Sequence, residues 1–112
     1  MSTLAENQCE ACRADAARIS TSELKELQAD IPQWTLTQDQ EVDQLFRQFK
    51  FKNFLQALEF ANAVGEIAEA NDHHPKIIVE WGKTTVYWWT HKIKGLHKND
   101  VIMAAKTDQL LR

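Results

Sequence analysis

The chain has 112 residues, a net charge of −3 and an apolar fraction of 44%. This length suits one domain with its own hydrophobic core, and the charge balance lacks the basic excess of proteins that bind DNA or RNA directly. No apolar run approaches the roughly 20 residues of a membrane-spanning helix, and no signal peptide is recognisable. We therefore expect a cytoplasmic protein without nucleic-acid or membrane partners.

The N-terminal segment 1–20 contains few large apolar side chains and is expected to be flexible, ahead of a single domain over 21–112. It carries both cysteines, Cys9 and Cys12, as one CxxC. Structural zinc usually needs a second pair of ligands, and a redox CxxC follows a strand and opens a helix. We interpret the pair as reduced and non-catalytic, with adventitious metal binding or redox sensing as the alternative.

A first helix is predicted to start at Ser20 or Thr21, either of which can cap it. Its apolar residues form one stripe: Leu24, Leu27 and Ile31. Pro32 ends it, because the residue before a proline is pushed out of the α region. Two strands at 34–36 and 41–51, joined by a polar turn at 37–40, then predict a hairpin. In the second strand Arg47 interrupts an apolar face formed by Leu45, Phe49 and Phe51.

The longest helix is predicted from its cap at Asn53 to about Asn71, and Pro75 bars its continuation. KIIVEW at 76–81 and TTVYWWTH at 84–91 predict a second hairpin, because apolar, β-branched and aromatic residues alternate in both. Large side chains lie on both faces of the last strand. A ligand or a second subunit is expected to cover the face away from the core.

A last helix is predicted from His97–Asn99 to the end of the chain. The resulting order, α-β-β-α-β-β-α, predicts an α+β domain in which three helices cover one face of a four-stranded antiparallel sheet. Such a sheet has two free edges, and edge pairing between copies would make a dimer. We expect a homodimer or homotetramer formed through a sheet edge or through helices.

Histidines occur where helices and strands end. His73 and His74 close the long helix, and His91 closes the last strand. If the two hairpins lie side by side under that helix, these ends meet at one rim of the sheet, where Asp100 can also reach. Taken singly, a histidine near a helix C-terminus more often satisfies free carbonyls. For His97 we keep a structural reading, because this residue is expected to form part of the start of the last helix.

A metal site is one reading of this cluster, with Glu69 and His73 one turn apart on the helix and His91 as a third ligand. Adjacent histidines diverge by about 100° on a helix, and neither HExxH nor a paired CxxC is present. Metal-free acid–base catalysis is favoured, because histidine titrates near neutrality. The aromatic residues that could stack on a flat heterocycle are Trp81, Trp88 and Trp89. At least one of them is expected to lie in the core instead.

EANDHHPK at 69–76, TH at 90–91 and Asp100 together resemble the signature of the pterin-4a-carbinolamine dehydratases, here of a bacterial member. The similarity extends over about 22–112 and includes three further segments: WTL at 34–36, FKFKNFLQALEFANAVGEIAE at 49–69 and KGLHKND at 94–100. There are two departures. Trp81 stands where the family commonly has tyrosine, and His97 replaces a helix-capping threonine.

The resemblance implies a hydro-lyase that converts 4a-hydroxytetrahydrobiopterin to quinonoid dihydropterin and water, in tetrahydrobiopterin recycling, without metal or cofactor. It implies catalytic roles for His73, His74 and His91. It implies substrate contacts for four further residues: Glu69, Pro75, Trp81 and Asp100. We expect His73 and His91 to be the main acid and base. We expect His74 to bind the ring or serve its other face, and Asp100 to orient His91 or bond the pterin.

The resemblance also implies a functional link to an aromatic amino acid hydroxylase, which forms the carbinolamine. Two other functions stay open at this point. Mammalian members of the family act as dimerisation cofactors of a transcription factor, so the chain could be a non-catalytic homodimeric adaptor or transcriptional cofactor. A pterin-related role in molybdenum cofactor metabolism is the third hypothesis.

Overall fold

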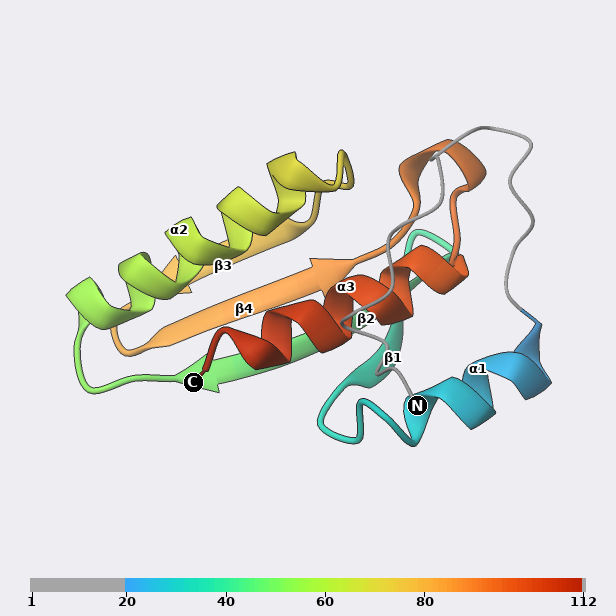
Figure 1. Ribbon diagram of the computed structural model, residues 1–112, viewed down its shortest axis with the longest axis horizontal. Coiled ribbons are helices and arrows are strands. Elements are labelled where there is room, and N and C mark those ends of the chain that lie inside the picture. The colour runs from blue at the N-terminus through green and yellow to red at the C-terminus, as the bar shows by residue number, and fades with distance from the viewer. Residues whose placement is uncertain (1–19, 112) are drawn as a thin grey trace.

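The structure, a computed structural model, describes residues 20–111; the CxxC pair and the rest of the segment 1–19 lie outside them. The elements follow one another in the predicted order, with one short 3-10 helix, η2, added before the last α-helix (Figure 1). They are α1 (Thr21–Gln28), β1 (Thr35–Asp39), β2 (Val42–Lys50), α2 (Phe54–Ala70), β3 (Lys76–Glu80), β4 (Lys83–Trp88), η2 (His91–Ile93) and α3 (Lys98–Gln109).

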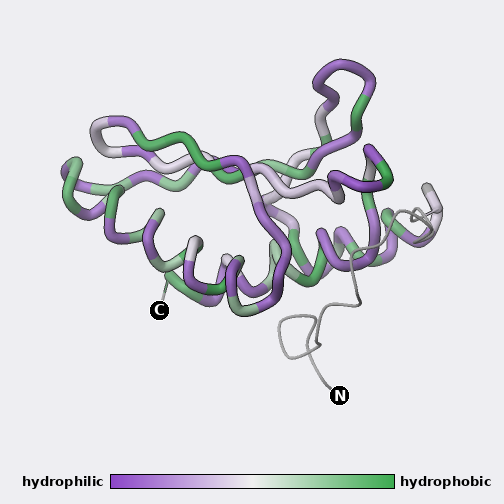
Figure 2. Tube along the Cα trace, turned by 90° about the horizontal axis from the view of Figure 1, so that it is seen from above, coloured by the Kyte–Doolittle hydropathy of each residue, from purple (hydrophilic) through white to green (hydrophobic). Residues whose placement is uncertain are grey.

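The four strands form one antiparallel sheet in the order β1-β2-β4-β3. Figure 2 shows the helices on one side of this sheet. Helix α2 packs on β3 and β4, α3 packs on β2 and β4, and α1 packs on α3. The predicted α+β architecture is thus confirmed. Within residues 20–111, no helix combines the length and apolarity needed to cross a membrane.

Capping residues set where the first two helices begin. The side chain of Ser20 accepts a hydrogen bond from the backbone N–H of Glu23, and that of Asn53 accepts one from Gln56. Helix α1 ends at Gln28, earlier than the predicted Ile31. The chain turns there, and Ile31 is completely buried in the core beneath the helices. Ile31 is an anchor after the helix rather than part of its stripe.

The first hairpin differs from the prediction at its turn. Strand β1 continues to Asp39, and the turn consists of Gln40 and Glu41, both with positive φ (51° and 67°). Positive φ at both central residues matches the right-handed twist of paired strands. Arg47 lies on the core-facing side of β2 as predicted. Its guanidinium is 2.7 Å from Asp108 of α3 and lies over the ring of Phe49.

The second hairpin turns at Trp81 and Gly82. Gly82 has φ +71°, and a Cβ there would come within 3.1 Å of the carbonyl oxygen of Phe51. Because the turn begins at Trp81, this residue is not the last residue of β3 as predicted. Its side chain is 72% exposed at the tip of the hairpin.

Candidate active site

The two adjacent histidines separate at the end of α2. Asp72 adopts a left-handed conformation (φ 49°), and the N–H of His73 bonds back to the carbonyl of Ala68 at 3.1 Å. This reversal turns His73 into the protein, where it is 3% exposed, while the side chain of His74 remains 53% exposed. The doublet therefore supplies one buried and one accessible imidazole at the same rim of the sheet.

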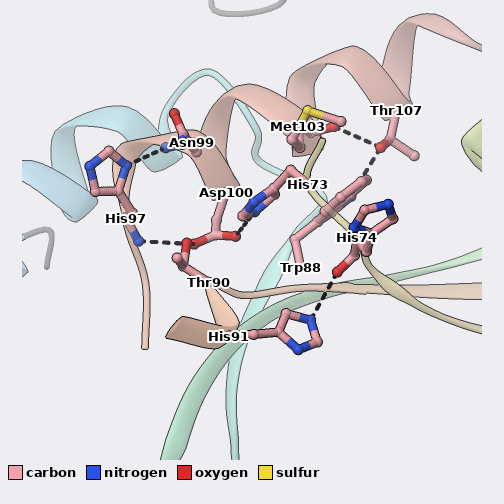
Figure 3. A network of polar contacts seen from close by, with 10 residues as sticks. All are labelled: His73, His74, Trp88, Thr90, His91, His97, Asn99, Asp100, Met103 and Thr107. Atoms are coloured by element: carbon pink, nitrogen blue, oxygen red, sulfur yellow. Dashed lines mark hydrogen bonds and ion pairs between the residues drawn. The ribbon is translucent and has the colours of Figure 1, made fainter. Parts of the chain in front are cut away.

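His73 forms a buried network with the start of α3 (Figure 3). Its Nε2 lies 2.6 Å from Oδ1 of Asp100, and its ring stacks on Trp88 with centroids 5.6 Å apart and planes 7° apart. The other carboxylate oxygen of Asp100 accepts hydrogen bonds from Thr90 Oγ1 at 2.8 Å and from the backbone N–H of His97 at 2.9 Å. Asp100 is fully buried, so these donors replace the water that a carboxylate requires.

His97 caps α3, where the resemblance led us to expect a threonine. Its Nδ1 accepts the backbone N–H of Asn99 at 3.1 Å, while Asp100 accepts the N–H of His97, which completes a capping box. The expectation that His97 belongs to the helix start is confirmed. Asp100 both closes this cap and contacts His73, so the helix start and the buried imidazole depend on one carboxylate.

His91 is fixed from two sides. Its ring stacks on Trp89 with centroids 4.4 Å apart and planes 21° apart, and its Nε2 lies 3.0 Å from the backbone oxygen of His74. A carbonyl oxygen can only accept, so Nε2 carries the hydrogen and Nδ1 holds the lone pair of the neutral ring. The accessible His74 is oriented in turn by Glu69, whose Oε1 is 2.7 Å from its Nε2.

These side chains surround one cleft of about 240 Å³. Its lining residues are Asp72, His73, His74, His91 and Lys92. The three histidines predicted to be catalytic thus come together, from two segments of the chain. Asp72 and Lys92 also line the cleft, although neither was predicted as a site residue. Each is the immediate sequence neighbour of a predicted histidine, which is the signal that could have found them.

The four residues predicted to contact substrate do not all lie at the cleft. Glu69 contacts His74, and Pro75 leads from the cleft into β3. Asp100 contacts His73 rather than His91 and does not line the cleft. Trp81 lies beyond the opposite end of β3, roughly 17 Å away along five extended residues. A single copy of the chain therefore does not bring Trp81 to the cleft.

The ligand set considered for a metal is not assembled. Glu69 pairs with His74, whereas His73 pairs with Asp100. Over residues 20–111, no three side chains among His, Cys, Asp and Glu are grouped so that they could hold a metal ion. In the same part of the chain, every buried side-chain nitrogen and oxygen has a hydrogen-bond partner. The histidines are thus arranged by hydrogen bonds and ring stacking.

Fold and cleft together define an α+β domain that gathers three imidazoles at one end of its sheet. A sequence profile of the family described as "Pterin 4 alpha carbinolamine dehydratase" matches residues 17–110. Two bacterial relatives are provisionally named as pterin-4-alpha-carbinolamine dehydratases. The chain is 55% identical to the one from Nitrosococcus oceani over 100% of this chain and 99% of the relative. It is 54% identical to the one from Saccharophagus degradans, over 98% of this chain and 97% of that relative.

A solved structure agrees with this assignment. The crystal structure of a transcriptional coactivator/pterin dehydratase from Brucella melitensis superposes with a TM-score of 0.74 at 29% identity, covering 84% of this chain and 98% of the other. The chain belongs to the pterin 4 alpha carbinolamine dehydratase family, as the resemblance indicated. It is therefore a member of a family of hydro-lyases.

Proposed function

We propose that the protein dehydrates 4a-hydroxytetrahydrobiopterin, or a close pterin, to quinonoid dihydropterin and water. The observation that carries this proposal is the convergence of His73, His74 and His91 on one cleft. Family membership gives the reaction class, and the cleft supplies side chains suited to it. An aromatic amino acid hydroxylase would supply the carbinolamine, which is the functional link that the resemblance implies.

The reaction needs one proton donor and one proton acceptor. The acid protonates the 4a-hydroxyl, the C–O bond breaks, and water leaves. The lone pair of the ring nitrogen forms the new C=N bond, and the base takes the proton from that nitrogen. One proton is given and one is taken, so the two imidazoles return to their starting states by exchange with solvent.

The hydrogen-bond partners favour one assignment of these roles. A carboxylate oxygen of Asp100 accepts from Nε2 of His73 and so holds a hydrogen on this ring, and we assign His73 as the acid. His91 donates Nε2–H to a carbonyl, so Nδ1 is available to accept a proton, and we assign His91 as the base. His74 binds the ring, held by Glu69. Asp72 and Lys92 offer a carboxylate and an ammonium at the wall of the cleft for polar groups of the pterin.

The test is the decay of a 4a-hydroxypterin, followed by absorbance with and without the protein. We expect catalysed decay that survives treatment with a chelator, because the acid and base are both side chains. Decay at the uncatalysed rate would contradict the dehydratase assignment. Loss of catalysis on chelation, restored by one metal, would contradict the metal-free mechanism.

We infer that a second copy completes the site through the edge strand β3. A two-fold pairing that overlaps all five residues of β3 is centred on Ile78, and it sets Lys76 opposite Glu80 of the partner subunit. In this register Trp81 comes opposite the partner's Pro75, beside its cleft. The same overlap at the other edge, β1, brings no opposite charges together. The β3 pairing would therefore give Trp81 the pterin contact that one copy cannot provide.

An adaptor function has its own support. Helix α2 exposes three large apolar residues in its first two turns: Phe54, Leu55 and Leu58. The solved relative from Brucella melitensis is named as both a coactivator and a dehydratase. A surface of this kind suits another helix. Because it lies on α2 away from the cleft, substitution of these residues should separate any partner binding from turnover.

A further inference from the structure

Strand β4 ends at Trp88, and the residue that follows it is also a tryptophan. Because side chains alternate along an extended chain, the two indoles point to opposite faces of the sheet. The indole of each tryptophan stacks on the imidazole ring of one histidine. Trp88, on the helix side, stacks on His73, and Trp89, just beyond the strand, stacks on His91. The acid and the base of the proposed reaction thus lie flat against neighbouring residues of one strand end.

We propose that Trp89 is a positioning residue for His91, an inference that rests on the proposed function. His91 is an exposed residue, and an exposed side chain is free to rotate unless contacts hold it. The indole at 4.4 Å fixes the plane of its ring, and the carbonyl of His74 at 3.0 Å fixes which nitrogen points away from the cleft wall. The two contacts together hold the ring in one orientation and leave Nδ1 as the nitrogen that can accept a proton.

The indole also acts during the reaction. When His91 accepts a proton it becomes an imidazolium, and the negative face of an aromatic ring stabilises a cation stacked on it. Trp89 therefore stabilises the charged state of the base more than the neutral state. Such an interaction raises turnover and leaves ground-state binding of the pterin almost unchanged.

Trp88 is unsuited to a direct test. It is completely buried, and its Nε1 donates to Thr107, which donates in turn to the carbonyl of Met103 (Figure 3). Its replacement would disturb the core and α3 together. Trp89 is only half-buried, so Trp89→Phe and Trp89→Leu are expected to fold. Phe46 offers a matched control, because it stacks on Tyr87 on the same outer face without contacting a histidine.

The experiment compares Trp89→Phe, Trp89→Leu and Phe46→Leu with the wild type in the full chain. We expect Trp89→Leu to lower kcat by about 2- to 30-fold, the range for a cation–π contact, with little change in KM. Trp89→Phe keeps an aromatic face and is expected to recover most of the loss. In ¹⁵N NMR of the pterin-free protein, His91 is expected to hold its hydrogen on Nε2 in the wild type and to become a mixture of tautomers in Trp89→Leu.

Three results would overturn the inference: wild-type kcat and tautomer in Trp89→Leu, no recovery in Trp89→Phe, or an equal loss in Phe46→Leu. The NMR readout requires no substrate. If the wild type fails to dehydrate any 4a-hydroxypterin, the proposed function fails, and the tautomer of His91 in the variants still decides whether Trp89 positions it.

Discussion

Nε2 of His73 lies 2.6 Å from Oδ1 of Asp100, and both side chains are almost completely buried. The contact joins the loop after α2 to the first turn of α3. Asp100 also closes the capping box of α3, where the helix dipole favours a negative charge. The carboxylate that starts the last helix is therefore the one that holds the proposed acid, so the fold and the site depend on the same residue.

Asp100→Asn tests this dependence. The amide places an N–H₂ against one of the donors that now face the carboxylate, which is expected to lower the free energy of unfolding by about 1–3 kcal/mol. The loss of charge beside His73 is expected to lower kcat by roughly 10-fold or more. Thr90→Val is the control, because it removes one donor and keeps the carboxylate, and its kcat should fall less. Wild-type kcat in a folded Asp100→Asn protein would show that catalysis by His73 does not require its contact with the Asp100 carboxylate.

Glu69→Gln is expected to act on binding rather than on folding. Glu69 and His74 are 79% and 53% exposed, and exposed ion pairs contribute at most about 1 kcal/mol. We therefore predict a nearly unchanged unfolding midpoint and a KM raised a few-fold, because His74 loses its orienting partner. Glu66→Gln, on the solvent side of the same helix, should leave both quantities unchanged. An equal effect of the two substitutions would argue against the contact.

Asp108→Ala should separate stability from catalysis. One oxygen of Asp108 accepts both Nε1–H of Trp34 at 2.8 Å and a guanidinium N–H of Arg47 at 2.7 Å, and so ties α3 to the first hairpin. Its removal is expected to cost about 1–3 kcal/mol in unfolding experiments. Turnover at a temperature where the variant is folded should match the wild type. A large fall in kcat would mean that the cleft depends on this end of α3.

The β3 pairing predicts a charge-swap result. Lys76→Glu places two acidic groups opposite each other at each end of the paired strands, and should weaken the dimer in sedimentation experiments. The double variant Lys76→Glu with Glu80→Lys restores opposite charges in the same register and should recover it. Recovery of turnover together with the dimer would support Trp81 as a contact to the partner's substrate. A dimer unchanged by the single swap would place the interface elsewhere.

Much of the fold was predictable because local signals agreed. Caps at Ser20 and Asn53 and the stop at Pro75 place helices without reference to the rest of the chain. The length of β1 was not predictable, because its polar sequence TLTQD lies largely exposed at a sheet edge and is indistinguishable from a turn. Arg47 interrupts an apolar face for a reason that only α3 reveals, since its partner Asp108 is 61 residues away.

The three histidines of the site could be predicted from the sequence, but most of their hydrogen-bond and stacking partners could not. The spacing of helix and strand ends indicated that His73, His74 and His91 would meet. The partner of Asp100 depends on the left-handed turn at Asp72, which sends His73 inward. Aspartate adopts this conformation more often than most non-glycine residues, but still rarely, so its presence at position 72 does not by itself predict the turn. The stacking of Trp89 on His91 likewise depends on how the chain leaves β4.

The central claim is that His73 and His91 exchange protons with a pterin in this cleft. The most direct measurement is kcat for dehydration of a 4a-hydroxypterin by His73→Ala and His91→Ala, with folding of each variant checked by its unfolding transition. We predict that each substitution lowers kcat by roughly 10²-fold or more. Near wild-type turnover in both folded variants would contradict the account.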